Sequence, residues 1–515
     1  MTRWRTLLVS LGLCIPLGAI GRSQERPAAR ADALDTTRID AYITAKMRSA
    51  RIPGVALAIV QRDRIAYLKG YGRADPSGRP VTPQTPFLIG SITKPFTALA
   101  VMQLVDAGRV GLDAPVQRYL PWFHLADSAA SARITVRQLL TMTSGIPQLY
   151  ETQVWTDQDD GALERAVRIL QTKKLAHAPG TSVEYSNANY DALGLIVQAV
   201  SGRSYEEYVT QHIFAPLAMR NSFASQDEAL RHGMASGHRW WFGIPVAVTF
   251  PYRRPELPAG YLISGAEDMA HFLIAQMNEG RYRDTAVLSP AGMAVMHAEP
   301  PPKHYGMGWE SLRANGRRLI NHDGGAANFQ ASVFFDPEAR VGVFVAADVI
   351  SALDAFSSPP GNSRLDGATT RAMAHTVLSM AMGEPVPSQG VGIEMLTVAF
   401  DLTILALTVV LLLSLMRMRG WYRRLVGRGV ENRAEAVSES AEVAVRNFVV
   451  PAAALYLTVA VPAWDALVIF QPDLEYWVNA VAIVLFLKGV VELALVWKVS
   501  GHAGRHLVVG GEARE

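Results

Sequence analysis

Ser91 and Lys94 form a Ser-x-x-Lys pair at the start of the apolar run LIGSITKPFTALAVMQLVDAGRV, residues 88–110. Residues three positions apart on a helix share one face, so the two side chains are expected to meet. A serine hydroxyl becomes a strong nucleophile when a base removes its proton, and a buried lysine loses enough proton affinity to act as that base. The pair indicates acyl transfer through serine, although the pattern is often matched by chance and serine is also a common N-cap.

Two later segments carry polar residues suited to the same chemistry. VEYSNANYDALGLIV (183–197) contains Tyr185 and Asn187, and NHDGGAANFQ (321–330) contains His322 followed by a Gly-Gly pair. Each alone has a structural explanation: an asparagine that caps a helix, and glycines that turn the chain before a strand expected at 329–335. These separate explanations do not account for the order in which the Ser91 segment and these two segments occur along the chain.

In that order the three segments resemble the Ser-x-x-Lys, Tyr-x-Asn and Lys/His-x-Gly motifs of the penicillin-recognising serine hydrolases. The resemblance is to the branch that contains class C β-lactamases, D,D-peptidases and esterases, and it covers about residues 35–385. Further similar stretches are LLTMTSGIP (139–147), APGTSVEYSN (178–187), LPAGYLISGAEDMA (257–270) and YGMGW (305–309). The implied fold is α+β and β-lactamase/transpeptidase-like, with an antiparallel sheet flanked by helices and a helical subdomain.

The resemblance also implies catalytic roles. Ser91 is the expected acylated nucleophile, and Lys94 is its expected proton acceptor or electrostatic partner. Tyr185 is expected to carry protons to the leaving group and to activate the deacylating water, with a pKa lowered by the nearby lysine. Which of Lys94 and Tyr185 is the dominant base stays open, because coupled groups share their titration.

The same resemblance implies a substrate-binding set. The expected substrate contacts come from Asn187, which also holds Lys94, and from His322 and Gly324. The backbone N–H groups of Ser91 and Gly325 are expected to form the oxyanion hole. The third motif departs from the Lys-Thr-Gly of many β-lactamases: a partly charged His322 replaces the lysine, and an Asp323 that faced the site would repel a substrate carboxylate. The third motif therefore gives no support for strong β-lactamase activity, which stays open, whereas hydrolysis is expected.

Alternating apolar patterns predict the elements that hold these residues. VALAIVQRDRIAYLKGYG (55–72) predicts a hairpin that turns at 61–63, and FQASVFFDPEARVGVFVAAD (329–348) predicts a second one that turns at 336–338. Mostly helical segments lie between them, so an antiparallel sheet built from both ends of the domain is expected. The run after Ser91 predicts a buried helix that ends at Gly108.

The N-terminus predicts export. Residues 1–24 combine a basic start, an apolar stretch and small residues, which is typical of a signal peptide, and a polar linker follows at 25–36. The hydrolase domain is expected at 37–385. Cys14 is the only cysteine in the sequence, so cleavage of the signal leaves none and excludes thiol catalysis and disulfides.

Residues 391–515 predict an all-α membrane domain with three spans, at about 395–416, 447–463 and 476–497. The first connection contains many basic residues and the second contains none, so the first connection is expected to be cytoplasmic. The hydrolase domain is then expected on the outer side of the cytoplasmic membrane, and the C-terminus in the cytoplasm. Asp401 lies within the first span. Lys488 and Glu492 lie four apart in the last span, where mutual neutralisation is favoured over a transport role.

The sequence thus predicts an exported, membrane-anchored serine hydrolase that cleaves ester or amide bonds through an acyl-enzyme on Ser91. The expected substrate is a small molecule or a peptide, which cell-wall material could supply: a peptide, a D-amino-acid peptide, an ester or a β-lactam-like compound. The alternative is an acylation-sensing receptor or a penicillin-binding protein without efficient turnover, although the chain offers only short cytoplasmic segments for an output. Scattered basic residues at a formal net charge of +3 give no support for nucleic-acid binding. No Gly-x-Ser-x-Gly or His-Glu-x-x-His motif occurs, and neither a metal nor a cofactor is expected.

Overall fold

The computed structural model describes residues 34–148, 157–249, 252–299, 305–326, 328–350, 369–386, 393–428, 433–449, 451–452, 455–456 and 472–509. The expected signal peptide and most of the expected linker lie outside the described residues. The first described helix, α1 (Thr36–Ser49), begins where the linker was expected to end, and the Asp35 carboxylate caps it by accepting a hydrogen bond from the Arg38 N–H.

A six-stranded antiparallel sheet forms the centre of the domain expected at residues 37–385, in the order β10-β11-β12-β13-β1-β2. Its strands are β1 (Gly54–Gln61), β2 (Arg64–Gly72), β10 (Glu310–Ala314), β11 (Arg317–Ala326), β12 (Phe329–Asp336) and β13 (Val341–Ala347). β1 pairs with β13 in a register that joins Val55 to Ala347 and Gln61 to Val341. The expected sheet built from both ends of the domain is confirmed, as are both hairpins.

The two hairpin turns follow from local chemistry. Arg62 turns the chain between β1 and β2 with a φ of 61°. In the second turn the Asp336 carboxylate accepts hydrogen bonds from the N–H groups of Glu338 and Ala339, both at 2.8 Å. An aspartate that accepts from backbone groups two and three positions ahead stabilises such a turn, so the Asp-Pro-Glu sequence fixes the register of β12 against β13.

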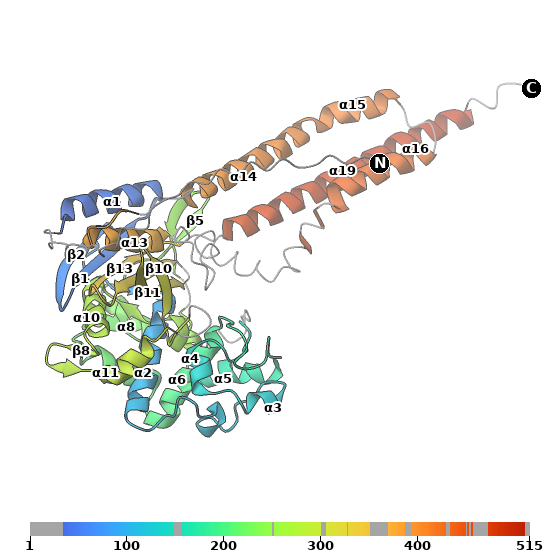
Figure 1. Cartoon of the computed structure of the whole chain (residues 1–515). Helices are drawn as coiled ribbons and strands as arrows, with labels where there is room; N and C mark the ends of the chain where they lie inside the picture. The colour runs from blue at the N-terminus through green and yellow to red at the C-terminus, as the bar shows by residue number, and fades with distance from the viewer. Residues whose placement is uncertain are drawn as a thin grey trace, which may run out of the picture. The chain divides into compact units, whose positions relative to one another are not determined.

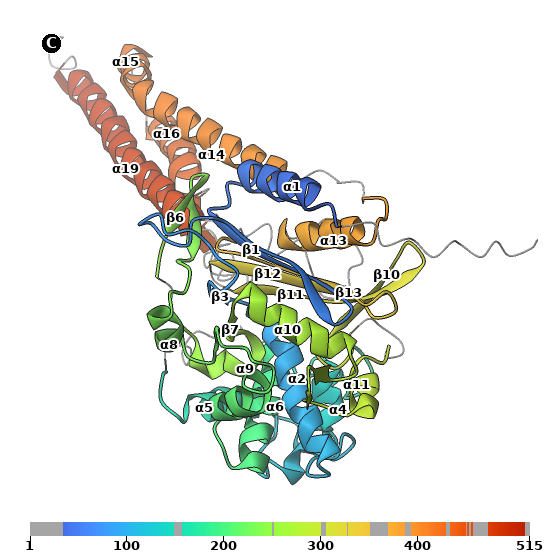
Figure 2. The same cartoon turned by 90° about the vertical axis from the view of Figure 1, so that its left-hand side faces the viewer.

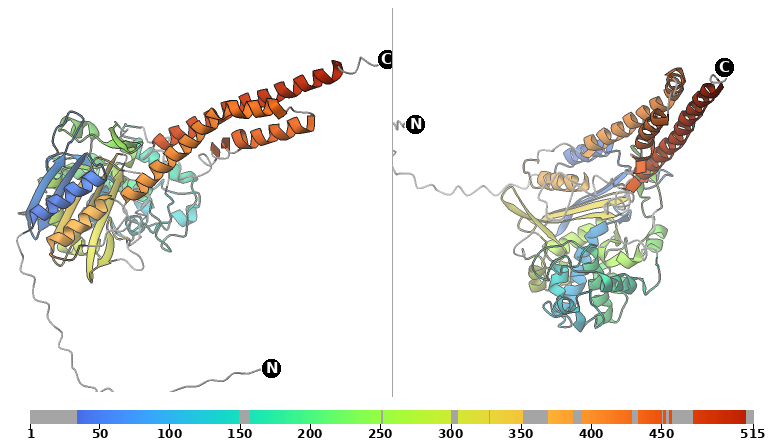
Figure 3. Two further views of the ribbon diagram at one scale, coloured as in Figure 1. Left: turned by 90° about the horizontal axis from the view of Figure 1, so that it is seen from above. Right: turned by 90° about the vertical axis from the view of Figure 1, so that its right-hand side faces the viewer.

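Helices cover both faces of the sheet, which explains why β12 and β13 are buried along their whole length. α1 and α13 (Thr369–Ala381) lie side by side on one face, and α10 (Ala266–Met277) lies on the other (Figures 1, 2 and 3). Beyond α10 lies α2 (Thr93–Asp106), where the Phe96 ring stacks on Phe272 of α10 with centroids 3.9 Å apart. α2 is buried on nearly all sides, as its largely apolar sequence predicts.

Short elements around α2 and α10 complete the domain. The helices are α3 (Ser128–Ser131), α4 (Val136–Leu140), α5 (Ala162–Arg168), α6 (Asn187–Ser201), α7 (Tyr205–Val209), α8 (Gln226–Arg231), α9 (Leu257–Gly260) and α11 (Pro290–Met296). The 3-10 turns are η1 (Gly90–Ile92), η2 (Val116–Arg118), η3 (Ile169–Thr172) and η5 (Arg254–Glu256), and η4 (Thr210–Phe214) is a π-turn. Short strands are β3 (Phe87–Leu88), β4 (Ser222–Phe223), β5 (His238–Trp241), β6 (Ile244–Ala247), β7 (Ile263–Ser264), β8 (Arg281–Tyr282) and β9 (Thr285–Ala286).

The C-terminal part of the described chain is helical. Its elements are α14 (Ile393–Met416), α15 (Met418–Arg428), α16 (Arg433–Ala444), the π-turn η6 (Val445–Val449) and α19 (Pro472–Val509). Two stretches, Asp401–Arg428 and Leu474–Ser500, are long and apolar enough to cross a membrane. The expected first and third spans fall in α14 and α19, whereas most of the expected middle span lies outside the described residues.

Charged side chains on α19 are paired, as their spacing predicts. Lys488 Nζ lies 2.9 Å from a carboxylate oxygen of Glu492. The other carboxylate oxygen accepts hydrogen bonds from Arg446 at 2.7 Å and from Asn447 at 2.9 Å. Because each charge has a partner, this cluster joins η6 to α19 without leaving an isolated charge among apolar side chains.

Candidate active site

Ser91 lies in the 3-10 turn η1, immediately before α2. The α-helix itself begins at Thr93, two residues later than the sequence predicts, because Gly90 adopts a φ of 56° and the chain enters the helix through a tighter turn. Lys94 follows in the first turn of α2 and is completely buried. Its side chain reaches back to Ser91, and Nζ lies 3.0 Å from the serine Oγ.

The amine of Lys94 has three partners, and they are not chemically equivalent. Nζ lies 2.8 Å from Asn187 Oδ1 and 2.7 Å from the carbonyl oxygen of Ala259. Both of these oxygen atoms can only accept hydrogen bonds. A neutral amine has two N–H groups and one lone pair. The two acceptors therefore take the N–H groups, and the lone pair faces Ser91, whose hydroxyl is the one partner of the three able to donate.

Burial lowers the pKa of Lys94 to about 7, because desolvation penalises the charged form. The negative charges of Asp191 and Glu256 act in the opposite direction. Both carboxyl groups are buried, and burial is also the main reason that their own pKa values are raised. Sequence reasoning missed both residues. Asp191 had a signal, since it lies four positions after Asn187 on the apolar face of α6.

Tyr185 lies beside this pair, with Lys94 Nζ 4.8 Å from the centroid of its ring. The expectation that the lysine lowers the pKa of the phenol is wrong. Burial raises the pKa of Tyr185, and a hydrogen bond with Ser91 only partly opposes that effect. Tyr185 is thus a protonated phenol near neutral pH, whereas Lys94 titrates there, and the resting site holds its available base on Lys94.

His322 lies on β11 and is a neutral imidazole. Burial, with a smaller contribution from the charge of Lys94, lowers its pKa to about 3. Nδ1 lies 2.6 Å from the carbonyl oxygen of Asp323, so Nδ1 carries the proton, and Nε2 accepts a hydrogen bond from the hydroxyl of Tyr305 at 3.1 Å. The expected partial charge at this position is therefore absent. Tyr305 was not singled out from the sequence, although it opens the YGMGW stretch.

Asp323 faces away from His322, so it does not repel a ligand in the site. The structural alternative for this segment, a glycine turn before the next strand, is wrong: residues 321–325 belong to β11, where successive side chains point to opposite faces. The Asp323 carboxylate forms an ion pair with the Arg371 guanidinium of α13 and accepts a hydrogen bond from Ser332 Oγ at 2.7 Å. The acidic residue of the third motif thus joins the sheet to α13.

Replacing Arg371 by methionine is expected to lower the free energy of unfolding by about 3 kcal/mol, because the buried guanidinium is the shared countercharge of the half-buried carboxylates of Asp323 and Glu310. Chemical denaturation of the hydrolase domain measures the change. Arg137→Met is the matched control: Arg137 pairs with an exposed Asp113, and loss of an exposed pair typically costs less than about 1 kcal/mol. Equal effects of the two substitutions would contradict this account of Asp323.

Gly324 brings β11 into direct contact with the turn that carries Ser91. A Cβ atom placed on Gly324 would lie 1.9 Å from the carbonyl oxygen of Ile89, and one on Gly90 would lie 2.7 Å from the backbone nitrogen of Gly325. The absence of both side chains therefore allows the main chain of the third motif to approach the nucleophile. This close approach brings the N–H groups of Ser91 and Gly325 into the same region, as an oxyanion hole requires.

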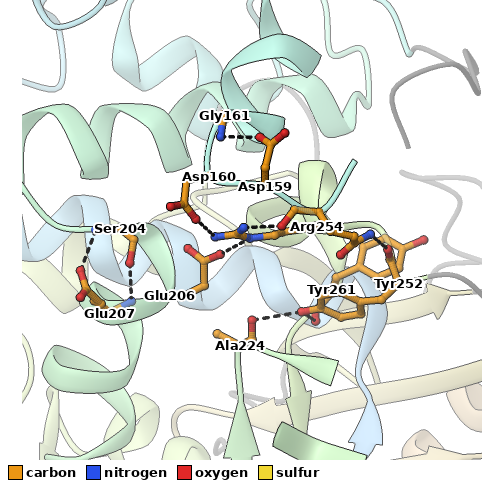
Figure 4. Close-up of polar contacts among 11 residues, drawn as sticks. Asp159, Asp160, Gly161, Ser204, Glu206, Glu207, Ala224, Tyr252, Arg254 and Tyr261 are labelled. Atoms are coloured by element: carbon orange, nitrogen blue, oxygen red, sulfur yellow. Dashed lines mark hydrogen bonds and ion pairs between the residues drawn. The ribbon is translucent and has the colours of Figure 1, made fainter. Parts of the chain in front are cut away.

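A polar network surrounds Arg254 (Figure 4). Arg254 donates to Glu206 at 2.9 Å and to Asp160 at 2.7 Å, beside a cavity of about 870 Å³. Arg254 is the first residue of η5, and α9 follows directly. η5 contains Glu256, whose charge acts on Lys94, and α9 contains Ala259, whose carbonyl oxygen accepts a hydrogen bond from Lys94. The residues lining this cavity include none of the expected catalytic groups, so the cavity is separate from the candidate active site.

The structure thus brings together the residues from all three motifs around one serine. Ala259, Tyr305, Asp191 and Glu256 join them without having been expected. Among the residues that the structure describes, no group of histidine, cysteine and acidic side chains could hold a metal ion.

Known proteins match this part of the chain. The beta-lactamase family model matches residues 39–349. Protein flp of Staphylococcus aureus strain MW2 is 31% identical over 316 residues, which are 61% of this chain and 63% of that relative, so the match spans less than two thirds of the relative's length. Penicillin-binding protein 4 of Amycolatopsis lactamdurans is 31% identical over 286 residues, 53% of this chain and 74% of that protein.

Solved structures agree with these matches. The octameric penicillin-binding protein homologue from Pyrococcus abyssi has a TM-score of 0.58 at 28% identity, covering 68% of this chain and 78% of that one. The D-alanine carboxypeptidase AmpC from Burkholderia cenocepacia shares the fold, with a TM-score of 0.54 at 23% identity over 68% of this chain and 98% of that one. With the fold and the three motifs in place, the family match over more than half of the sequence establishes that the chain belongs to the beta-lactamase family.

Proposed function

We propose that this chain is a membrane-anchored serine hydrolase that cleaves ester or amide bonds through an acyl-enzyme on Ser91. One observation carries the proposal: the buried Lys94 amine, whose pKa burial lowers to about 7, lies 3.0 Å from the Ser91 Oγ, and its two other partners only accept hydrogen bonds. Asn187 and Ala259 already satisfy the hydrogen bonds of a neutral Lys94 amine, so a purely structural role of this lysine would not require Ser91. The arrangement matches what activation of a serine nucleophile requires.

In the proposed reaction Ser91 Oγ attacks the carbonyl carbon of the substrate as its proton moves to Lys94 Nζ. The carbonyl oxygen gains negative charge, which the N–H groups of Ser91 and Gly325 stabilise. The bond to the leaving group then breaks, and the leaving group takes a proton that Tyr185 donates and recovers from Lys94. Water attacks the ester on Ser91 in a second round of the same transfers, which releases the acid and restores the serine.

The proposed substrates are esters or amides whose recognition does not depend on a free carboxylate. His322 is neutral, and Asp323 with its partner Arg371 lies on the opposite face of β11, so the third motif supplies no cation toward the site. Efficient β-lactam hydrolysis is not expected for that reason. Similarity to a penicillin-binding protein and to a D-alanine carboxypeptidase supports acyl-enzyme chemistry on peptide-like substrates, including D-amino-acid peptides.

The proposed location is the outer face of the cytoplasmic membrane. The two apolar stretches in α14–α15 and α19 support anchoring in a bilayer. The orientation rests on the basic residues that follow α14, namely Arg417, Arg419, Arg423, Arg424, Arg428, Arg433 and Arg446, which favour the cytoplasmic side. The hydrolase domain then lies outside, and the lipid bilayer is the partner of the C-terminal helices.

The test is covalent labelling of the full chain with a fluorophosphonate and with a labelled penicillin, read by intact mass. Labelling by the fluorophosphonate is expected in the natural protein and in Ser128→Ala, which changes an exposed serine, and is expected to be lost in Ser91→Ala. Labelling that persists in Ser91→Ala would overturn the proposal. A penicillin adduct that forms on Ser91 and persists would instead favour a penicillin-binding protein without efficient turnover.

A further inference from the structure

The hairpin formed by β5 and β6 carries apolar side chains where a water-exposed hairpin carries polar ones (β5 in Figure 1, β6 in Figure 2). Four large side chains at its tip are 42% to 62% exposed: Trp241, Phe242, Ile244 and Val246. Along β6 the outward positions are Ile244 and Val246, which reverses the usual alternation of buried apolar and exposed polar residues. Contiguous exposed apolar groups of this kind mark a surface that binds another protein or a membrane.

The base of this hairpin is anchored firmly to the hydrolase domain. The His238 N–H donates to the carbonyl oxygen of Asp348 at 2.7 Å, directly after β13, and the Arg239 Nε donates to Asn328 Oδ1 at 3.0 Å. The turn at the tip uses Phe242 and Gly243 with φ values of 46° and 75°, which suits the twist of a two-residue hairpin. The apolar tip is therefore a defined projection of the domain and not a loose loop.

Its composition matches the interface of a lipid bilayer. Tryptophan and phenylalanine favour the boundary between headgroups and acyl chains, and β-branched aliphatic side chains favour the acyl side. Arg51 donates a hydrogen bond to the carbonyl oxygen of Gly243 at the tip, and Arg239 lies on β5. Cationic groups behind an apolar tip are placed to meet anionic headgroups.

The helices of the same chain supply the reason to choose lipid as the occupant. The Trp241 ring lies 5.7 Å from the ring of Tyr476, near the start of α19, and a Cβ on Gly243 would lie 2.7 Å from a carboxylate oxygen of Asp401, at the start of the first apolar stretch. The basic residues after α14 favour the outer side for the N-terminal halves of both helices, which contain Asp401 and Tyr476. The hairpin tip therefore meets the helices in the parts that would lie in the outer leaflet.

We propose that the β5–β6 tip inserts into the outer leaflet and holds the hydrolase domain against the membrane surface as a third point of attachment beside the helices. This inference rests on the membrane anchoring proposed above. An attachment point on the domain itself fixes the orientation of the active site relative to the lipid, so substrates presented at the membrane surface are favoured over those in bulk solution.

The test uses depth-dependent fluorescence quenching in the full chain, reconstituted in phosphatidylglycerol-containing nanodiscs. Cys14 is the only natural cysteine, so Cys14→Ser with Ile244→Cys allows one environment-sensitive fluorophore to be placed at the tip. We expect a blue-shifted emission and a loss of fluorescence when the lipids carry nitroxide-labelled acyl chains. Leu230→Cys in the same background is the matched control, because Leu230 is an apolar residue of α8 that is 54% exposed. Its label is expected to remain in water and unquenched.

Each other outcome overturns the proposal in a distinct way. A blue-shifted label at position 244 that nitroxide lipids do not quench would identify a protein occupant, and an unshifted, unquenched label would place the tip in water. Flotation of the discs separates these results from failed anchoring: a chain that leaves the bilayer contradicts both proposals, whereas a chain that stays with an unquenched tip contradicts only the insertion. Fluorophosphonate labelling of Ser91 verifies that each variant is folded.

Discussion

Replacing Lys94 by methionine is expected to lower the rate of Ser91 acylation by about 10³- to 10⁴-fold, at the upper end of the range for loss of a positioned proton acceptor. Methionine keeps much of the volume and the apolar contacts of the lysine stem, but it has no lone pair that can receive the serine proton. The rate constant for fluorophosphonate labelling measures the effect. Lys174→Met, at an exposed lysine, serves as the matched control and is expected to label at the natural rate.

The pH dependence of the natural protein tests the same role without a substitution. Lys94 accepts a proton only when neutral, and its pKa is lowered to about 7. The acylation rate is therefore expected to rise with pH, to level off above about pH 7, and to fall about tenfold for each unit below it. In Lys94→Met this dependence should disappear. If the acylation rate of the natural protein were constant between pH 5 and 8, the assignment of Lys94 as the base would be wrong. A thermal unfolding transition like that of the natural protein would show that Lys94→Met is folded.

Replacing Gly324 by alanine is expected to lower the acylation rate by about 10²- to 10³-fold, the effect of losing one oxyanion donor. The added methyl group would lie 1.9 Å from the carbonyl oxygen of Ile89, which belongs to the main chain and cannot rotate away. β11 and the Ser91 turn must therefore separate, which moves the Gly325 N–H from the position that a developing oxyanion occupies. Labelling rates measured alongside denaturation curves distinguish this local displacement from unfolding.

Gly111→Ala is the control for that substitution. A Cβ there would meet its nearest atom, the Ala114 Cβ, at 3.4 Å, an ordinary contact. We expect natural labelling rates for this variant. If Gly324→Ala also labelled at the natural rate, the close approach of β11 to the serine turn would not be needed for acylation, and the oxyanion role of Gly325 would be wrong.

The sequence was sufficient wherever function depends on residues close together in the chain. The spacing of Ser91 and Lys94 predicts that their side chains meet, and alternating apolar runs predict both hairpins of the central sheet. The orientation of Asp323 was within reach as well, because it follows from alternation once residues 321–325 are assigned to a strand. The two glycines argued for a turn instead, since their role in permitting a close approach depends on Ile89 and is invisible in the local pattern.

Other features of the site depend on contacts between distant segments, which no spacing reveals. Tyr305 orients His322, and Ala259 and Glu256 reach Lys94 from a different part of the chain. The charge states were also beyond the sequence, because they follow from burial. A histidine near its usual pKa and a tyrosine with a lowered one were reasonable expectations for partly hydrated groups, but enclosure makes the first neutral and keeps the second protonated.

The pairing of β1 with β13 has a consequence for the order in which the protein can be made. These strands are neighbours in the sheet, with Val55 beside Ala347, but they come from opposite ends of the domain's sequence. Forming the middle of the sheet therefore requires one of the longest loop closures available to the domain. A chain delivered from its N-terminus exposes β1 long before its partner arrives. Final folding of the domain is therefore expected to wait until β13 has emerged, when the apolar helices that follow are next to be delivered. Biogenesis thus couples completion of the catalytic sheet in time to insertion of those helices.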